Sequence, residues 1–217
     1  MLIYNIGMKI FIASDLHGSA EYCRRLKEAF YSEKAEKLLL LGDILYHGPR
    51  NDLPEDYSPK QVVSLLEPLK NKIICVSGNC DAEIDRVVLP FPLVSDLGLI
   101  VVDGLNIYFA HGHKEEPHLA KGDVYLTGHT HVAVHEEHEG HYHLNPGSLS
   151  LPKENSKHGY IVYENRKFTF KDLSGEVYAE LEIPELVEED PPKEPVKEAH
   201  AATRPHVVRR KIIVRRR

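Results

Sequence analysis

Five short stretches of the sequence combine aspartate, asparagine and histidine with glycine at spacings that metal sites use. They are Asp15-x-His17, Gly42-Asp43, Gly78-Asn79-Cys80-Asp81, His111-Gly112-His113 and Gly128-His129-Thr130-His131. The candidate metal ligands among them are Asp15, His17, Asp43, Asn79, His111, His129 and His131. Carboxylate, amide and imidazole donors suit Mn²⁺, Fe, Zn²⁺ or Mg²⁺ and disfavour a structural zinc site built from thiolates.

Seven donors are too many for one ion and suit two ions that share a carboxylate. Two divalent ions about 3.5–4 Å apart activate water and hold a phosphoryl group for in-line displacement. Taken singly, Asp15 also suits a helix N-cap and Asn79 suits a turn. Because the five stretches occur together, the sequence predicts a dinuclear metal site for phosphoryl chemistry.

Strand ends must bring these stretches together. Residues 8–14, 37–42 and 72–77 are predicted strands, and the apolar periodicity of residues 19–33 predicts a helix between the first two. Alternating strands and helices predict a parallel sheet, in which the loops at the carboxyl ends converge on one site. We expect Asp15 and His17 to share one face of an extended segment. The glycines allow sharp turns and leave room in the site.

A second helix is predicted after residue 58. Ser58, Pro59 and Gln61 provide an N-cap, a proline in the first turn and a capping-box residue. After residue 90 we expect an antiparallel half, starting with a hairpin whose type I′ turn is Asp103-Gly104. Further strands are predicted at 124–127, 132–135, 142–144, 160–163, 167–170 and 177–183. The domain prediction is residues 1–183, followed at 184–217 by a Glu/Pro/Lys-rich linker and a basic C-terminal tail.

Composition limits the functional classes. Of 217 residues 42% are hydrophobic, which is enough for a core, and the net charge is −6. The last 14 residues hold seven Arg and Lys and no acid, so residues 1–203 carry −13. This acidic body argues against a general nucleic-acid binder, apart from the basic tail. The three cysteines lack C-x-x-C spacing and no apolar run reaches 18 residues, so we expect a cytoplasmic protein without a membrane span.

The N-terminal stretch is apolar but lacks a leading basic segment and a cleavage-like site. We therefore expect a strand there and no signal peptide, with Met8 as an alternative start to Met1.

The order D-x-H, GD, GN, H and GHTH resembles that of the calcineurin-like metallophosphoesterases. The stretches "GDILYHGPRNDLPEDYSP", "GNCD", "GHTH" and "NPGSLSLPK" are similar to the YfcE-like branch of small bacterial phosphodiesterases, and the resemblance covers about residues 8 to 180. It implies a four-layer αββα sandwich, in which two mixed β-sheets are flanked by helices. It also implies hydrolysis of phosphodiester bonds by a hydroxide that bridges two metals.

The resemblance also implies a role for each ligand. Asp15, His17 and His131 would hold one metal, Asn79, His111 and His129 the other, and Asp43 would bridge them. Manganese is the expected metal, with zinc, iron, nickel or magnesium as alternatives. Two divalent ions with two aspartates leave a charge of about +2, which a hydroxide and a singly charged phosphodiester neutralise. We therefore expect a small phosphodiester substrate, and Arg50 either contacts its phosphate or braces its own loop.

Cys80 departs from the family pattern, because many relatives have histidine after the Gly-Asn pair, where it assists the leaving group. A thiol is a poor substitute for imidazole in that role, so we expect slower turnover and a preference for good leaving groups. The alternatives are a phosphomonoesterase, a cyclic-nucleotide phosphodiesterase, a nuclease, or a non-catalytic scaffold like the Vps29 subunit of retromer. The sequence leaves a homo-oligomer open.

Overall fold

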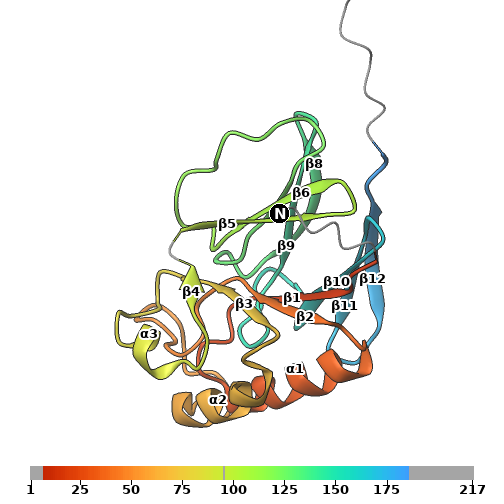
Figure 1. Ribbon diagram of the computed structural model, residues 1–217. Coiled ribbons are helices and arrows are strands. Elements are labelled where there is room, and N and C mark those ends of the chain that lie inside the picture. The colour runs from red at the N-terminus through yellow and green to blue at the C-terminus, as the bar shows by residue number, and fades with distance from the viewer. Residues whose placement is uncertain (1–6, 95, 186–217) are drawn as a thin grey trace, which may run out of the picture. The chain divides into compact units, whose positions relative to one another are not determined.

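The computed structural model describes residues 7–94 and 96–185, which belong to one compact unit (Figure 1). The helices are α1 (Ala20–Ser32), α2 (Pro59–Leu66), the 3-10 helix η1 (Glu67–Leu69) and α3 (Asp85–Val88). The strands are β1 (Ile10–Ala13), β2 (Lys37–Leu40), β3 (Ile73–Val76), β4 (Leu93–Val94), β5 (Leu97–Val102), β6 (Leu105–Ala110), β7 (Val124–Leu126), β8 (Ala133–His138), β9 (His141–Pro146), β10 (Gly159–Glu164), β11 (Lys167–Asp172) and β12 (Val177–Glu182).

The strands form two mixed sheets. The first has the order β12-β11-β10-β1-β2-β3-β4, in which β1 to β4 run parallel and β10 to β12 run antiparallel. The second has the order β5-β6-β7-β9-β8, with hairpins at both edges and parallel pairs in the centre. The predicted parallel half is found in β1 to β4, but the half after residue 90 is not wholly antiparallel, because β6, β7 and β9 pair in parallel. Two mixed sheets were correctly predicted. β10 returns to the first sheet because β1 is buried and needs a hydrogen-bonding partner on its free edge.

Two apolar layers hold the sheets and helices together. Phe11 on β1 faces α1, where Leu26 and Phe30 are fully buried against it. Ile10 and Ile12 point to the opposite face and pack in the layer between the sheets. This alternation explains why β1 is apolar at every position and buried on both sides.

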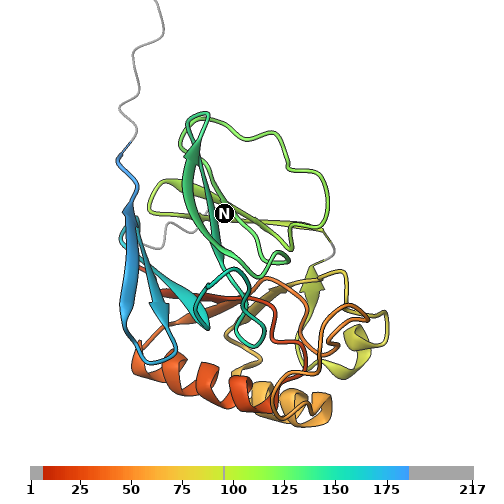
Figure 2. The ribbon, with the colours of Figure 1, turned by 180° about the vertical axis from the view of Figure 1, so that it is seen from behind.

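The helices lie on one side of the molecule. Figures 1 and 2 show α1 and α2 along the outer face of the seven-stranded sheet, away from the five-stranded sheet. Within residues 7–94 and 96–185, no helix covers the outer face of the five-stranded sheet, where the fourth layer was expected. The connection from β6 to β7 is a loop at residues 111–123, in which Gly112, Pro117 and Gly122 disfavour a helix. No helix of the described residues is long and apolar enough to cross a membrane.

Most local predictions were correct to within a few residues. Ser19 caps α1 by accepting the Tyr22 backbone N–H at 3.2 Å, and Asp103 and Gly104 both have positive φ, as a type I′ turn requires. α2 begins at Pro59 as predicted, but the Ser58 side chain makes no capping hydrogen bond, so the capping-box prediction was wrong. The linker and tail predicted at 184–217 lie outside the described residues from 186 onwards, so that boundary stays a prediction.

Candidate metal centre

All five polar stretches meet where the two sheets adjoin. Asp15, Asp43 and Asn79 follow β1, β2 and β3 of the seven-stranded sheet. His111 follows β6, and His129 and His131 follow β7, of the five-stranded sheet. The predicted convergence at the carboxyl ends of strands is therefore found, but with both sheets contributing. The loops are held by backbone hydrogen bonds such as that from Asp15 N–H to the Gly42 carbonyl at 3.2 Å.

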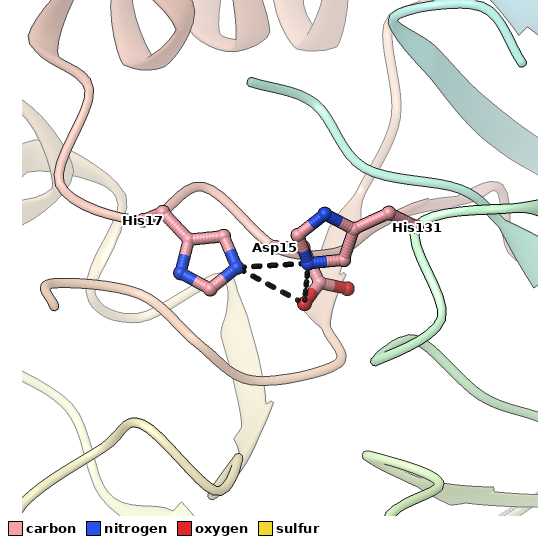
Figure 3. Close-up of side chains that lie close together, drawn as sticks. All are labelled: Asp15, His17 and His131. Atoms are coloured by element: carbon pink, nitrogen blue, oxygen red, sulfur yellow. Dashed lines mark hydrogen bonds and ion pairs between the residues drawn. The ribbon is translucent and has the colours of Figure 1, made fainter. Parts of the chain in front are cut away.

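Asp15, His17 and His131 form a buried group in which one carboxylate oxygen and two ring nitrogens lie close together (Figure 3). The Asp15 Oδ1 atom lies 3.4 Å from His17 Nε2 and 3.3 Å from His131 Nε2, and the two Nε2 atoms are 3.0 Å apart. The Nδ1 atoms of His17 and His131 lie 2.8 and 2.7 Å from the Tyr46 and Leu151 carbonyl oxygens. A carbonyl only accepts, so each Nδ1 carries a proton and each Nε2 offers a lone pair.

The same group contains an orphaned acceptor. Asp15 Oδ1 is buried without a hydrogen-bond donor. Such an atom is costly to bury unless a positive partner is present. A cation among these three atoms would satisfy Asp15 Oδ1, and the donor set fits a divalent metal.

A second group lies around His111. Its Nδ1 donates to the Leu41 carbonyl at 2.7 Å, which leaves Nε2 facing Asn79 Oδ1 at 3.1 Å and Asp43 Oδ2 at 3.3 Å. Asp43 Oδ2 also lies 3.7 Å from His17 Nε2 in the first group. The Asp43 carboxylate thus faces both groups, which is the position that a shared ligand requires.

His129 differs from the other six predicted ligands. Its backbone N–H donates to Asp15 Oδ2 at 2.9 Å, but its ring packs edge-on against His111, with centroids 5.1 Å apart. No hydrogen bond joins its ring nitrogens to another residue of the described chain. The His113 ring lies 5.5 Å from His111 and 6.0 Å from His129, which places it beside the centre.

The backbone at the centre is strained. Five of the predicted ligands have a left-handed φ: Asp15 (56°), His17 (49°), Asp43 (54°), His129 (66°) and His131 (63°). Each such residue costs about 1–3 kcal/mol, and such costs cluster at functional sites. The expectation that Asp15 and His17 share a face of an extended segment was therefore wrong. Their side chains converge because the chain turns at both positions.

Two glycines allow the loops to approach one another. A Cβ at Gly78 would lie 2.1 Å from Asp43 Oδ1. A Cβ at Gly128 would lie 1.9 Å from Ser14 Oγ and 2.7 Å from Asp15 Oδ2. Neither position has room for a larger residue, as predicted for the site.

Asp81 is a positioning residue that the sequence analysis missed. Its carboxylate accepts the backbone N–H groups of Asp43 at 2.9 Å, Ile44 at 2.8 Å and Gly78 at 2.7 Å. It therefore joins the loop after β2 to the loop after β3, and burial raises its pKa. The only signal in the sequence is its place two residues after Asn79. The loop at residues 145–148 likewise borders the site, since the Ser148 hydroxyl donates to the Asp15 carbonyl at 2.7 Å.

The charges of the centre depend on one another. Burial raises the Asp15 pKa, but the close approach of the His131 and His17 rings and the nearby charge of His111 outweigh it, so the net pKa lies well below its usual range. Burial lowers the His111 pKa, but hydrogen bonding to Asp43 and the nearby charges raise it to about 9. Without metal the centre therefore holds a proton at His111, and a metal ion would have to displace it.

A cavity of about 330 Å³ opens over the centre. Its lining includes Asp43, Asn79, Cys80, His129 and His131, together with Gly48, Pro49, Arg50, Asn51, Thr130 and Lys153. Arg50 thus borders the site where a phosphate contact was predicted, whereas Lys153 was not predicted.

Cys80 sits in the wall of this cavity. Its sulfur lies within 4.8 Å of ligand atoms of His17 and Asp43, and its N–H donates to Asp43 Oδ1 at 2.8 Å. Burial and the charge of Asp43 raise the pKa of the Cys80 thiol to about 12. In the metal-free protein the thiol therefore stays protonated, which disfavours it as a nucleophile in that state.

Residues 8–167 match the calcineurin-like phosphoesterase superfamily domain, and the chain belongs to this family. Phosphodiesterase YfcE of Escherichia coli is 40% identical over 162 residues, which are 73% of this chain and 88% of that protein. A solved structure of YfcE matches with a TM-score of 0.79 at 37% identity, over 82% of this chain and 100% of that one.

More distant matches are found in sequence and in structure. Phosphodiesterase MJ0936 of Methanocaldococcus jannaschii is 28% identical over 151 residues, covering 64% of this chain and 83% of that protein. The structure of Vps29 from Cryptosporidium parvum matches with a TM-score of 0.56 at 20% identity, over 82% of this chain and 100% of that one. The likeness to Vps29 concerns the fold alone.

Proposed function

We propose that this protein is a phosphodiesterase that requires two divalent metal ions. The observation that carries the proposal is a pair of donor groups that both face Asp43: buried Asp15, His17 and His131 form one, and buried His111 with the exposed Asn79 forms the other. In the proposed assignment, Asp15, His17 and His131 hold one ion, Asn79, His111 and His129 hold the other, and Asp43 bridges. The 40% identity to phosphodiesterase YfcE supports the same reaction.

Several residues of the chain orient the proposed metal ligands and the substrate. When bound, two divalent ions supply Lewis acidity and a nucleophile derived from water. The Leu41, Tyr46 and Leu151 carbonyls fix the rings of His111, His17 and His131, so that each Nε2 points inward. Arg50 on the cavity wall is proposed to contact the phosphate of the substrate.

Manganese is the proposed metal, because mixed carboxylate and imidazole ligands suit it. Zinc, iron, nickel and magnesium are the alternatives, and metal analysis of protein purified without added ions decides between them. We also propose a cytoplasmic setting, supported by the three free cysteines Cys23, Cys75 and Cys80.

Cys80 supports a preference for substrates with good leaving groups. A thiol is a poorer proton donor to a leaving group at neutral pH than the imidazole that many relatives have at this position. Esters whose leaving group is a stable anion need no such donor, so activated aryl diesters are the appropriate first substrates.

The direct test is hydrolysis of bis(4-nitrophenyl) phosphate by Asp43→Ala with Mn²⁺ present. The variant lacks the carboxylate that faces both donor groups, so we expect at least a 1000-fold loss of kcat/KM, as when a group essential to the reaction is removed. His138→Ala, on the exposed β8–β9 hairpin, is the matched control and should keep wild-type activity. Full activity of Asp43→Ala would refute the proposed centre.

A substrate panel separates the remaining alternatives. Rates on phosphomonoesters, cyclic nucleotides and single-stranded nucleic acid, measured beside the diester, decide whether a diesterase is the right class. A protein that binds metal but hydrolyses none of these would favour the scaffold alternative, and sizing in solution would report any homo-oligomer.

A further inference from the structure

Two cationic side chains border the cavity without partners. Arg50 and Lys153 line it together, and both residues are exposed. Neither side chain has a hydrogen bond or ion pair with any residue of the described ranges. Other exposed lysines, such as Lys60 and Lys70, also lack a side-chain partner among the described residues, so what distinguishes Arg50 and Lys153 is their place at the cavity.

Arg50 and Lys153 lie on different walls of the cavity. Arg50 lies in a loop whose Gly48 packs on Cys80, since a Cβ at Gly48 would lie 2.8 Å from the Cys80 sulfur. Lys153 follows β9, and its backbone N–H donates to the His131 carbonyl at 3.0 Å. One cation is therefore anchored beside the Cys80 wall and the other beside a predicted metal ligand.

A phosphodiester with a single negative charge would leave the site with excess positive charge. Asp43 is the only acid in the cavity lining, and it belongs to the proposed ligand set. Two divalent ions with Asp15 and Asp43 leave about +2, which the nucleophile and a singly charged diester cancel. The charges of Arg50 and Lys153 are then left over, in a chain whose net charge is −6. Arg and Lys placed in this way bind phosphate oxygens.

We propose that the substrate carries a second anionic group beside the scissile phosphate, bound by Arg50 and Lys153, and that it is a diphosphate with an organic group on each phosphate. This inference rests on the proposed function and names its substrate class. A cavity of about 330 Å³ is at the small end of ligand sites, so the second anion must lie close to the first. Adjacent phosphates of a diphosphate satisfy that requirement.

The reaction consumes one water. The water oxygen forms a bond to one phosphorus, and the bond from that phosphorus to the bridging oxygen breaks. The bridging oxygen leaves with the electron pair on the second phosphate, and the protons of water go to the two phosphate monoesters or to solvent. The leaving group is an anion, so it needs little proton donation.

The first test compares kcat/KM of the Mn²⁺-loaded protein on diadenosine diphosphate and on bis(4-nitrophenyl) phosphate. Arg50→Gln and Lys153→Gln should each lower the value for the diphosphate by about 10- to 100-fold, because each removes a charge-assisted hydrogen bond. Lys153→Gln should lower the value for the aryl diester by about threefold or less. Arg50→Gln should lower it further, because Arg50 is also proposed to contact the scissile phosphate. Arg50→Lys and Lys153→Arg should restore most of the loss, and Lys157→Gln, on the same loop as Lys153, should behave as wild type.

A second comparison decides whether the second anionic group is the adjacent phosphate of a diphosphate or a more distant phosphate. A dinucleotide with a separate 5′-terminal phosphate carries two anions that are further apart than those of a diphosphate. If Lys153→Gln penalises this dinucleotide and spares the diphosphate, the diphosphate assignment is overturned. Equal losses on the diphosphate and the aryl diester in Lys153→Gln overturn the whole inference, while the proposed function stands.

A binding measurement separates this inference from the proposed function. By titration calorimetry, methylenediphosphonate should bind the wild-type protein at least 10-fold more tightly than methylphosphonate, and Lys153→Gln should remove most of that difference. Equal affinities would overturn the inference even if the diester is hydrolysed. Failure to hydrolyse any ester, with the diphosphonate preference intact, would refute the proposed function and retain the anion site.

Discussion

At the scale of single residues, the sequence identifies donor types but not their local conformations. Asp15, His17, Asp43, Asn79, His111 and His131 lie together as predicted, because each motif ends a strand. The left-handed φ of Asp15 and His17 could not be predicted, since spacing in a sequence carries no information on strain. Lys153 was missed because a lysine in a loop has no distinctive sequence pattern.

Cys80 offers the sharpest test at this scale. Cys80→His replaces a thiol by an imidazole whose reference pKa is near neutrality, so it should improve protonation of the leaving group. We expect about a 10-fold or larger gain in kcat on a diester with an alkyl leaving group and a smaller gain on bis(4-nitrophenyl) phosphate. Cys80→Ser is the control, because a hydroxyl is not an acid at neutral pH. Equal gains on both substrates would contradict a role at the leaving group.

At the scale of elements, the loops after β2 and β3 act as one unit. Asp81 accepts N–H groups from both of them, and Gly78 lets them touch. Long periodic elements such as α1 were predicted well, since an amphipathic stripe is a strong signal. The two-residue β4 and the four-residue α3 were missed, because such short elements have no periodicity to detect.

Asp81→Asn tests this unit. The amide is neutral and has one accepting oxygen, so all three backbone donors lose their charged partner and at least one loses its acceptor. We expect a loss of about 1–3 kcal/mol in the free energy of unfolding, seen by denaturant titration. Metal affinity, measured by calorimetry, should fall by at least 10-fold, because Asp43 is no longer held in place.

Asp52→Asn is the matched control for Asp81→Asn, since Asp52 is exposed and the described structure gives its side chain no hydrogen-bond partner. It should change neither quantity. A variant at Asp81 that lost stability but kept wild-type metal affinity would show that Asp81 does not position the ligands.

At the scale of the whole molecule, the centre joins the two sheets. Asp15, Asp43 and Asn79 follow strands of the seven-stranded sheet, and His111 and His131 follow strands of the five-stranded one. Fold class was predictable because the motifs and strand patterns agree at every level. The absence of a helix on the outer face of the five-stranded sheet, within the described residues, was not predictable. It depends on the connection at residues 111–123 rather than on the strands.

The stability of the metal-free protein should therefore depend on pH. His111 has a folded pKa of about 9, above its usual 6.5, so its contribution is complete below pH 6.5 and is lost as pH rises through 9. The Tm of the chelated protein should fall over this window by several degrees, given about 1.4 kcal/mol per pKa unit. The metal-loaded protein should not show this fall, because metal binding requires the unprotonated ring.

Thermal melts with chelator and with Mn²⁺, at steps from pH 6.5 to 9, check this expectation. The difference between the two Tm values should widen as pH rises. A chelated protein whose Tm rises across the window would contradict the proposed coupling between His111 and Asp43.

The left-handed turns at Asp15, His17, Asp43, His129 and His131 have a consequence for the choice of metal. Since folding itself holds these backbone conformations, the ligand residues need little rearrangement when a metal ion binds. Ions of similar radius would then exchange in and out without remodelling the polypeptide. The metal that the protein binds in a living cell would then depend more on which ions are available than on the geometry of the site.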